Sequence, residues 1–129
     1  MKPAPDVARI LVVDDDPDIR GLTEAVLADA GYQVGSAGSG DQALRDVAER
    51  RYDLVLLDVN MPGMDGWETL RLIRADDALD HLPVVMFTVK GELHDKMQGL
   101  QDGAADYVTK PFVVDQLLER VGRVLETRR

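Results

Sequence analysis

Short runs of apolar residues alternate along the chain with segments in which apolar residues recur at helical spacing. Continuous apolar runs are typical of parallel strands buried on both faces, and a helical stripe is typical of a helix that covers a sheet. The runs predict strands at Ile10–Val13, Tyr32–Gly35, Leu54–Leu57, Val84–Phe87 and Asp106–Val108. The first, third and fourth runs are the most apolar, so we expect these strands at the centre of the sheet.

Five helical segments follow the five strands. Their stripes run from Ile19 to Ala30, from Ala43 to Ala48, from Gly66 to Ile73, from Leu93 to Leu100, and over Val114–Thr127. The fourth stripe is the weakest because Gly99 interrupts it. Residues 9–129 are therefore predicted to form one α/β domain with a parallel sheet between two layers of helices, preceded by a flexible segment over residues 1–8.

The connections carry the residues that begin and end helices. Asp16 and Pro17 are typical of an N-cap and a first helical residue, and Ser39 is a second N-cap candidate. Ala30 and Gly31 form a typical helix stop. Capping explains Asp16 without any catalytic role.

Composition narrows the classes of function. The chain has 24 acidic and 15 basic residues and a net charge of −9, which opposes direct binding to nucleic acid or anionic lipid. It contains no cysteine, so disulfides, thiolate nucleophiles and thiolate zinc sites are excluded. The absence of a signal-peptide pattern and of a long apolar run predicts a cytoplasmic protein with no membrane insertion.

Polar residues stand where the predicted strands end. Asp14 and Asp15 follow the first strand, Asp58 ends the third, Thr88 follows the fourth, and Thr109 and Lys110 follow the fifth. Because ligands of open parallel sheets bind at the carboxyl ends of the strands, these residues are expected to share one site.

Converging carboxylates repel one another unless a cation lies between them, and Mg²⁺ is the hard, oxygen-seeking ion that fits such a set. Asp58 is single and stands at the tip of an apolar strand, so it is the best candidate for a carboxylate nucleophile in phosphoryl transfer. Lys110 and the Thr88 hydroxyl could then stabilise the charge on the transferred group.

Four segments together resemble the receiver domain of bacterial two-component response regulators, of the single-domain type that is similar to the chemotaxis Y protein. They are Leu11–Asp16, Leu56–Gly66, Phe87–Thr88 and Asp106–Phe112. The resemblance implies a flavodoxin-like, doubly wound sheet with strand order 2-1-3-4-5 and five flanking helices.

The resemblance also implies roles for individual residues. Asp58 would be the phosphoacceptor, Asp15 and Asp58 would ligate Mg²⁺ with the backbone carbonyl of Asn60, and Asp14 would act mainly through water. Thr88 and Lys110 would hold the phosphoryl oxygens. Thr88 and Tyr107 would form the switch that reshapes the surface of the fourth helix, fifth strand and fifth helix.

The partners implied are a sensor histidine kinase or histidine phosphotransfer protein as donor, and a downstream target protein. Such a protein is a signalling switch that catalyses its own phosphorylation and dephosphorylation, rather than a turnover enzyme. It would be a monomer or a phosphorylation-dependent dimer. Val89 departs from the family pattern, in which a smaller residue commonly follows the threonine, and Lys90 stands one residue further.

Several alternatives remain at this point. Tyr107 could be an ordinary core aromatic residue, and the Lys110–Pro111 peptide bond could be cis or trans. A haloacid-dehalogenase-type phosphatase is disfavoured by Asp18, and a calcium loop by Ile19 and Ala25. The main competing function is a receiver-like module that binds partners without ever being phosphorylated.

Overall fold

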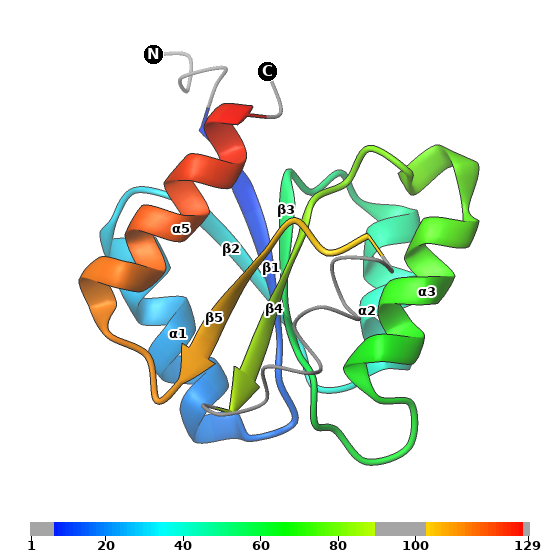
Figure 1. Cartoon of the computed structure of the whole chain (residues 1–129), viewed down its shortest axis with the longest axis horizontal. Helices are drawn as coiled ribbons and strands as arrows, with labels where there is room; N and C mark the ends of the chain where they lie inside the picture. The colour runs from blue at the N-terminus through cyan, green and yellow to red at the C-terminus, as the bar shows by residue number, and fades with distance from the viewer. Residues whose placement is uncertain (1–6, 90–102, 128–129) are drawn as a thin grey trace.

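The computed structural model describes residues 7–89 and 103–127, and it contains one five-stranded parallel sheet (Figure 1). The strands are β1 (Arg9–Val13), β2 (Gln33–Ala37), β3 (Leu54–Asp58), β4 (Val84–Val89) and β5 (Asp106–Lys110). Their order is β2-β1-β3-β4-β5, which confirms both the predicted topology and the central position of the most apolar strands.

Helices cover both faces of the sheet (Figure 1). Helices α1 (Pro17–Asp29) and α5 (Val114–Thr127) lie on one face, and α2 (Gly40–Glu49) and α3 (Gly66–Ala75) lie on the other, with a 3-10 turn η1 (Asp77–Leu79) after α3. The predicted fourth helix, around Leu93, Met97 and Leu100, lies outside the described residues. Over the described ranges, no helix has the length and hydropathy needed to cross a bilayer.

Each strand of the sheet centre contributes side chains alternately to two apolar cores. In β1, Leu11 and Val13 belong to the core under α2 and α3, whereas Ile10 and Val12 belong to the core under α1 and α5. All four are at most 1% exposed. This alternation explains why the strands read as continuous apolar runs, since both faces of a central strand are covered.

The predicted helix boundaries are confirmed by cap geometry. The Asp16 side chain accepts hydrogen bonds from the N–H groups of Asp18 and Ile19, and Pro17 is the first residue of α1. Ser39 caps α2 by accepting from the N–H of Gln42. Helix α1 ends before Gly31, whose φ of 102° lies in the left-handed region that favours glycine.

The sheet extends further at its carboxyl edge than the apolar runs indicate. Thr109 and Lys110, predicted to follow the fifth strand, belong to β5 because they pair with Thr88 and Val89 of β4. The prediction that the strand ends at Val108 was therefore wrong by two residues. Main-chain pairing continues where the side chains become polar, and this places Lys110 on a fixed face of the sheet.

Arg74 connects the end of α3 to the amino ends of β4 and β5. Its guanidinium donates to the carbonyl oxygens of Leu79 (3.3 Å), Leu82 (2.6 Å) and Gly103 (3.1 Å). These carbonyls precede β4 and β5, so one half-buried side chain holds the starts of both strands against the helix.

Gly66 allows α3 to begin directly on the backbone of β3. A methyl group at this position would lie 2.2 Å from the carbonyl oxygen of Asp58 and 2.8 Å from the Cα of Val59. Both neighbours are main-chain atoms, which cannot turn aside as a flexible side chain could. Any residue larger than glycine would therefore push the start of α3 away from the end of β3.

We expect Gly66→Ala to lower the free energy of unfolding by about 1–3 kcal/mol, because the added methyl group overpacks a backbone contact. Gly21→Ala in α1 is the matched control, since a methyl group there meets no atom within 4 Å. That change should raise stability by about 0.5–1 kcal/mol through helix propensity. Urea denaturation measures both, and equal effects of the two substitutions would contradict the close-packing argument.

Candidate functional site

Three charged side chains meet at the carboxyl edge of the sheet because of their register. Asp14, Asp58 and Lys110 each stand two residues beyond a residue of the core under α1 and α5, namely Val12, Leu56 and Val108. Side chains two apart in a strand point to the same face, and Asp14, just after β1, continues the pairing because its N–H donates to the carbonyl of Ala37 at 3.1 Å. The predicted convergence at this edge is therefore confirmed for these three residues.

Lys110 bridges the two buried acids. Its Nζ lies 2.9 Å from Oδ2 of Asp14 and 3.0 Å from Oδ1 of Asp58. The two carboxylate side chains are 1% and 4% exposed, whereas the lysine is 18% exposed. One ammonium group thus holds together the acid that follows β1 and the acid that ends β3.

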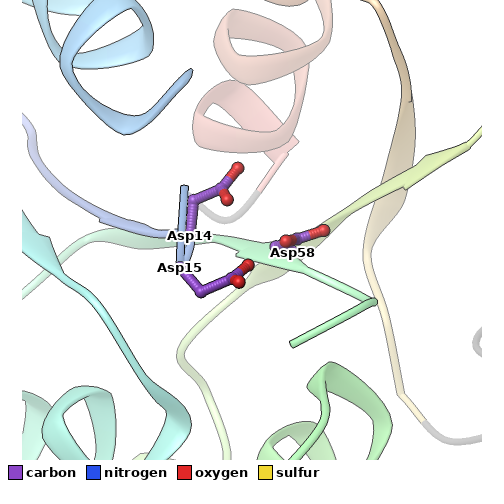
Figure 2. A group of neighbouring side chains, drawn as sticks. All are labelled: Asp14, Asp15 and Asp58. Carbon is purple, nitrogen blue, oxygen red and sulfur yellow. The ribbon is translucent and has the colours of Figure 1, made fainter. Parts of the chain in front are cut away.

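Asp15 completes an acidic cluster of the kind that holds a metal ion (Figure 2). Carboxylate oxygens of Asp14, Asp15 and Asp58 all lie within 4.8 Å of one another, and Asp15 is the exposed member of the group. Apart from the Lys110 ammonium, no described group satisfies the buried Oδ2 of Asp14 with a hydrogen bond. An all-oxygen donor set, in which a buried carboxylate oxygen has only an ammonium beside it among the described groups and a second carboxylate faces solvent, fits Mg²⁺.

Local contacts hold the two buried acids in place. Oδ1 of Asp14 accepts from the N–H of Asp16 (3.0 Å), and Oδ1 of Asp58 accepts from the N–H of Asn60 (3.3 Å). This second contact places Asn60 next to the acceptor candidate, while its carbonyl as a metal ligand stays a prediction. Asp16 is used as a helix cap, in agreement with its predicted structural role.

Arg20 is a neighbour of the site that the sequence patterns did not indicate. Its Nη1 donates to the backbone carbonyl of Asp14 (2.8 Å), and its guanidinium lies against Gly38 in the turn after β2. It thereby fixes the main chain that carries Asp14 and Asp15. A lone arginine in an amphipathic helix reads as an exposed charge, so no sequence signal could have singled it out.

Aromatic rings lie next to the Lys110 side chain. Its Nζ lies 5.2 Å from the centroid of the Phe87 ring, and Phe87 packs at 5.7 Å against Phe112. A cation over an aromatic face is attracted by the ring quadrupole. The Lys110–Pro111 peptide bond is cis, as the family resemblance favours.

Thr88 and Tyr107 lie on the opposite face of the sheet from Lys110. Tyr107 pairs in register with Met86, and Thr88 is two residues further along β4, so the two are diagonal neighbours on one face. They are 2% and 6% exposed. This arrangement suits a coupled pair, but their movement stays a prediction, and Lys90 lies outside the described residues.

Burial is the dominant influence on the pKa of Asp58. Burial, together with the nearby Asp14 carboxylate, raises the pKa from 3.8 to about 6, although Lys110 and the Asn60 N–H lower it. For Lys110, burial alone would lower the pKa, but hydrogen bonds and charges from Asp14 and Asp58 outweigh it and raise the pKa. Lys110 therefore remains an ammonium at neutral pH.

Fold and site together define a flavodoxin-like α/β protein with an acidic, lysine-bridged metal-type site at the carboxyl edge of its sheet. The response regulator receiver domain profile matches residues 10–122, and the chain belongs to this family. This confirms the resemblance on which the residue assignments depend.

Individual relatives agree with this assignment. The DNA-binding response regulator MtrA of Mycolicibacterium smegmatis is 47% identical over 113 residues, covering 88% of this chain and 48% of MtrA. The transcriptional regulatory protein PrrA of Mycobacterium tuberculosis is 40% identical, covering 93% of this chain and 51% of PrrA. The chain thus spans about half the length of these curated relatives.

Solved structures share the fold closely. The chemotaxis protein CheY4 of Vibrio cholerae superposes with a TM-score of 0.87 at 36% identity, covering 92% of this chain and 98% of CheY4. The receiver domain of NtrX from Brucella abortus has a TM-score of 0.86 at 38% identity, with the same coverage.

The raised pKa of Asp58 predicts a pH dependence of stability in the absence of metal. Between pH 4 and 6 the Asp58 carboxyl of the folded protein holds a proton that the unfolded chain has released. The contribution of this proton to the free energy of unfolding is full below pH 3.8 and is lost above about pH 6. Asp58→Asn removes the buried charge, while Lys110 keeps Asp14 as a partner. At pH 7.5 the variant should exceed the parent in unfolding free energy by about 1–3 kcal/mol.

Urea denaturation in a chelating buffer at pH 4, 5, 6 and 7.5 measures this difference. It should grow with pH, and Mg²⁺ should then stabilise the parent but not Asp58→Asn. A difference that does not change with pH would contradict the assignment of the raised pKa to Asp58.

Proposed function

We propose that this receiver domain accepts a phosphoryl group on Asp58 and acts as a phosphorylation-controlled signalling switch. The observation that carries the proposal is the buried Asp58 carboxylate, held 3.0 Å from the Lys110 ammonium inside a three-carboxylate cluster. A carboxylate so placed can act as a nucleophile, and the fixed cation beside it can receive the charge of the transferred group.

In the transfer step an oxygen of Asp58 forms the new bond to phosphorus. The bond from phosphorus to the leaving group of the donor breaks, and the leaving group keeps the electron pair. Asp15, Asp58 and the Asn60 carbonyl would hold Mg²⁺, with Asp14 acting mainly through water. The bound ion would supply positive charge beside the phosphoryl oxygens. Lys110 pairs with one of these oxygens.

The Thr88 hydroxyl donates to a second phosphoryl oxygen. Movement of Thr88 toward the site frees space beside its diagonal neighbour Tyr107, which then reshapes the surface of the predicted fourth helix, β5 and α5. A downstream target protein reads that surface. Hydrolysis of the aspartyl phosphate at the same site returns the switch to its first state.

The donor is a sensor histidine kinase or a histidine phosphotransfer protein. An apolar groove beside the site suits the surface of such a partner, and it is lined by Ile19, Leu22, Phe87, Pro111, Phe112 and Val114. Lys110 lines the same groove, so a protein seated there lies next to the acceptor. Leu22 and Val114 are 58% and 46% exposed, and their apolar surface favours a covering partner.

We infer a cytoplasmic location and either a monomer or a phosphorylation-dependent dimer. The names of MtrA and PrrA describe DNA-binding and transcriptional regulation by those proteins, of which this chain matches about half. A net charge of −9 opposes direct contact of this chain with nucleic acid, so any output of that kind would pass through another domain or protein.

Incubation with acetyl phosphate and Mg²⁺ should add one phosphoryl group to the parent, as read by intact mass. The gain should disappear in Asp58→Asn, because the acceptor carboxylate is gone, and in the parent when Mg²⁺ is chelated. Retained labelling of the variant would move the acceptor elsewhere. No labelling of the parent by acetyl phosphate or by any kinase would favour the competing module that binds partners without phosphorylation.

Leu22→Asp should slow phosphoryl transfer from a protein donor about tenfold, because it puts a charge in the lining of the apolar groove. Labelling by acetyl phosphate should not change, since a small donor needs no groove. Leu72→Asp on α3 is the matched control, with a similar exposed leucine on the other face. Transfer rates from a panel of radiolabelled kinases and phosphotransfer proteins measure the effect, and equal slowing by both substitutions would argue against this surface.

A further inference from the structure

The geometry points to Trp67 as a positioning residue for Tyr107. We propose that Trp67 stabilises the buried position of Tyr107 and forms a second connection, beside Thr88, between Asp58 and the switch surface. This inference rests on the proposed function, because it assigns a new residue to the same switch.

The first observation is a direct aromatic contact. The rings of Trp67 and Tyr107 have centroids 6.5 Å apart and planes tilted by 53°. This is the tilted geometry that the charge distribution of aromatic rings favours. Tyr107 is 6% exposed and Trp67 is half-buried, so a partly exposed ring on α3 contacts an almost fully buried ring on β5.

The second observation is that α3 begins on the backbone of the acceptor residue. Trp67 follows Gly66, whose N–H donates to the carbonyl of Val59 at 2.9 Å and whose Cα has no room for a side chain against Asp58. No side chain separates the first turn of α3 from the end of β3. A shift of the Asp58–Val59 backbone therefore has to move the start of α3.

The third observation is that the first turn of α3 is held as one unit. The side chain of Asp65 accepts from the N–H of Glu68 (2.9 Å), and the buried Thr69 hydroxyl donates to the carbonyl of Asp65 (2.9 Å). Thr69 also fits against Gly40 of α2, where a methyl group would lie 2.3 Å from its Oγ1. A displacement at Gly66 is thus passed to the Trp67 ring rather than absorbed in a loose turn.

Tyr107 therefore has neighbours on two different elements. Thr88 is its diagonal neighbour on β4, and Trp67 approaches from α3. Both neighbours are linked to Asp58, Thr88 through the hydroxyl proposed to bind the phosphoryl group and Trp67 through the backbone contact of Gly66. Loss of Trp67 should loosen Tyr107 without removing any group that takes part in phosphoryl transfer.

Fluorine NMR of the full chain labelled with 3-fluorotyrosine tests the inference. The chain has three tyrosines, and Tyr107→Phe assigns the Tyr107 signal. Spectra are recorded with and without acetyl phosphate and Mg²⁺, and intact mass gives the phosphorylated fraction. Trp67→Leu removes the ring, Trp67→Phe keeps an aromatic ring, and Leu72→Ala is the control on the same helix.

We expect Trp67→Leu to lower the ratio of buried to exposed Tyr107 roughly three- to tenfold, with the phosphorylated fraction unchanged. Trp67→Phe should restore most of the buried population, and Leu72→Ala should leave the spectrum as in the parent. A Tyr107 signal that is the same in Trp67→Leu and the parent, in both conditions, overturns the inference.

Failure of the proposed function gives a different result. If the parent gains no phosphoryl mass, the proposed switch fails, while the spectra without donor still test the contact between Trp67 and Tyr107. If Trp67→Leu does not fold, the fluorescence emission maximum of Trp67 in the Tyr107→Leu variant tests the contact instead. Trp67 is the single tryptophan of the chain, so the emission is its own. A red shift relative to the parent supports the contact, and an unchanged spectrum overturns it.

Discussion

The structure depends on one electrostatic arrangement, in which the Lys110 ammonium lies between the buried carboxylates of Asp14 and Asp58. Carboxylates packed at one point repel one another and lose hydration, and both effects disfavour the folded state. Together with Asp15, three carboxylates face one ammonium group, so two negative charges remain uncompensated. A divalent cation would supply the missing charge, and a phosphoryl group on Asp58, as proposed, would give Lys110 a new anionic partner.

The rest of the fold makes this arrangement possible. Central strands that are apolar on both faces hold their ends rigidly, and the alternation of side chains directs Asp14, Asp58 and Lys110 to one face. The same alternation directs Thr88 and Tyr107 to the other face. The site and the proposed switch surface therefore lie on opposite faces of the sheet, and within residues 7–89 and 103–127 the strand ends and the helices that contact them connect the two.

The sequence predicts the parts of this structure that follow from periodicity and from chain direction. Strand positions agree to within about two residues, the last helix agrees at both ends, and the acids meet because parallel strands end at one edge. The lysine bridge itself was not predictable from the pattern. It requires β5 to continue through Thr109 to Lys110, and this continuation depends on pairing with β4 rather than on apolar side chains.

The pattern of apolar and polar residues also does not predict contacts between residues far apart in the chain. Arg74 looks like an ordinary charged residue at the end of a helix, yet it binds three carbonyls around the starts of β4 and β5. The sequence does not indicate which residue Trp67 contacts, because its contact with Tyr107 joins positions on α3 and β5.

Gly66 shows why such contacts matter for coupling. A turn signal accounts for a glycine there, but only the packing shows that the helix rests on the backbone of Asp58. A closely packed protein interior cannot deform gradually. A displacement of one backbone segment therefore either moves the segment in direct contact with it or is prevented by that segment. The absence of a side chain at Gly66 thus gives β3 a stiff connection to α3, and through Trp67 to the face of the sheet that carries Tyr107.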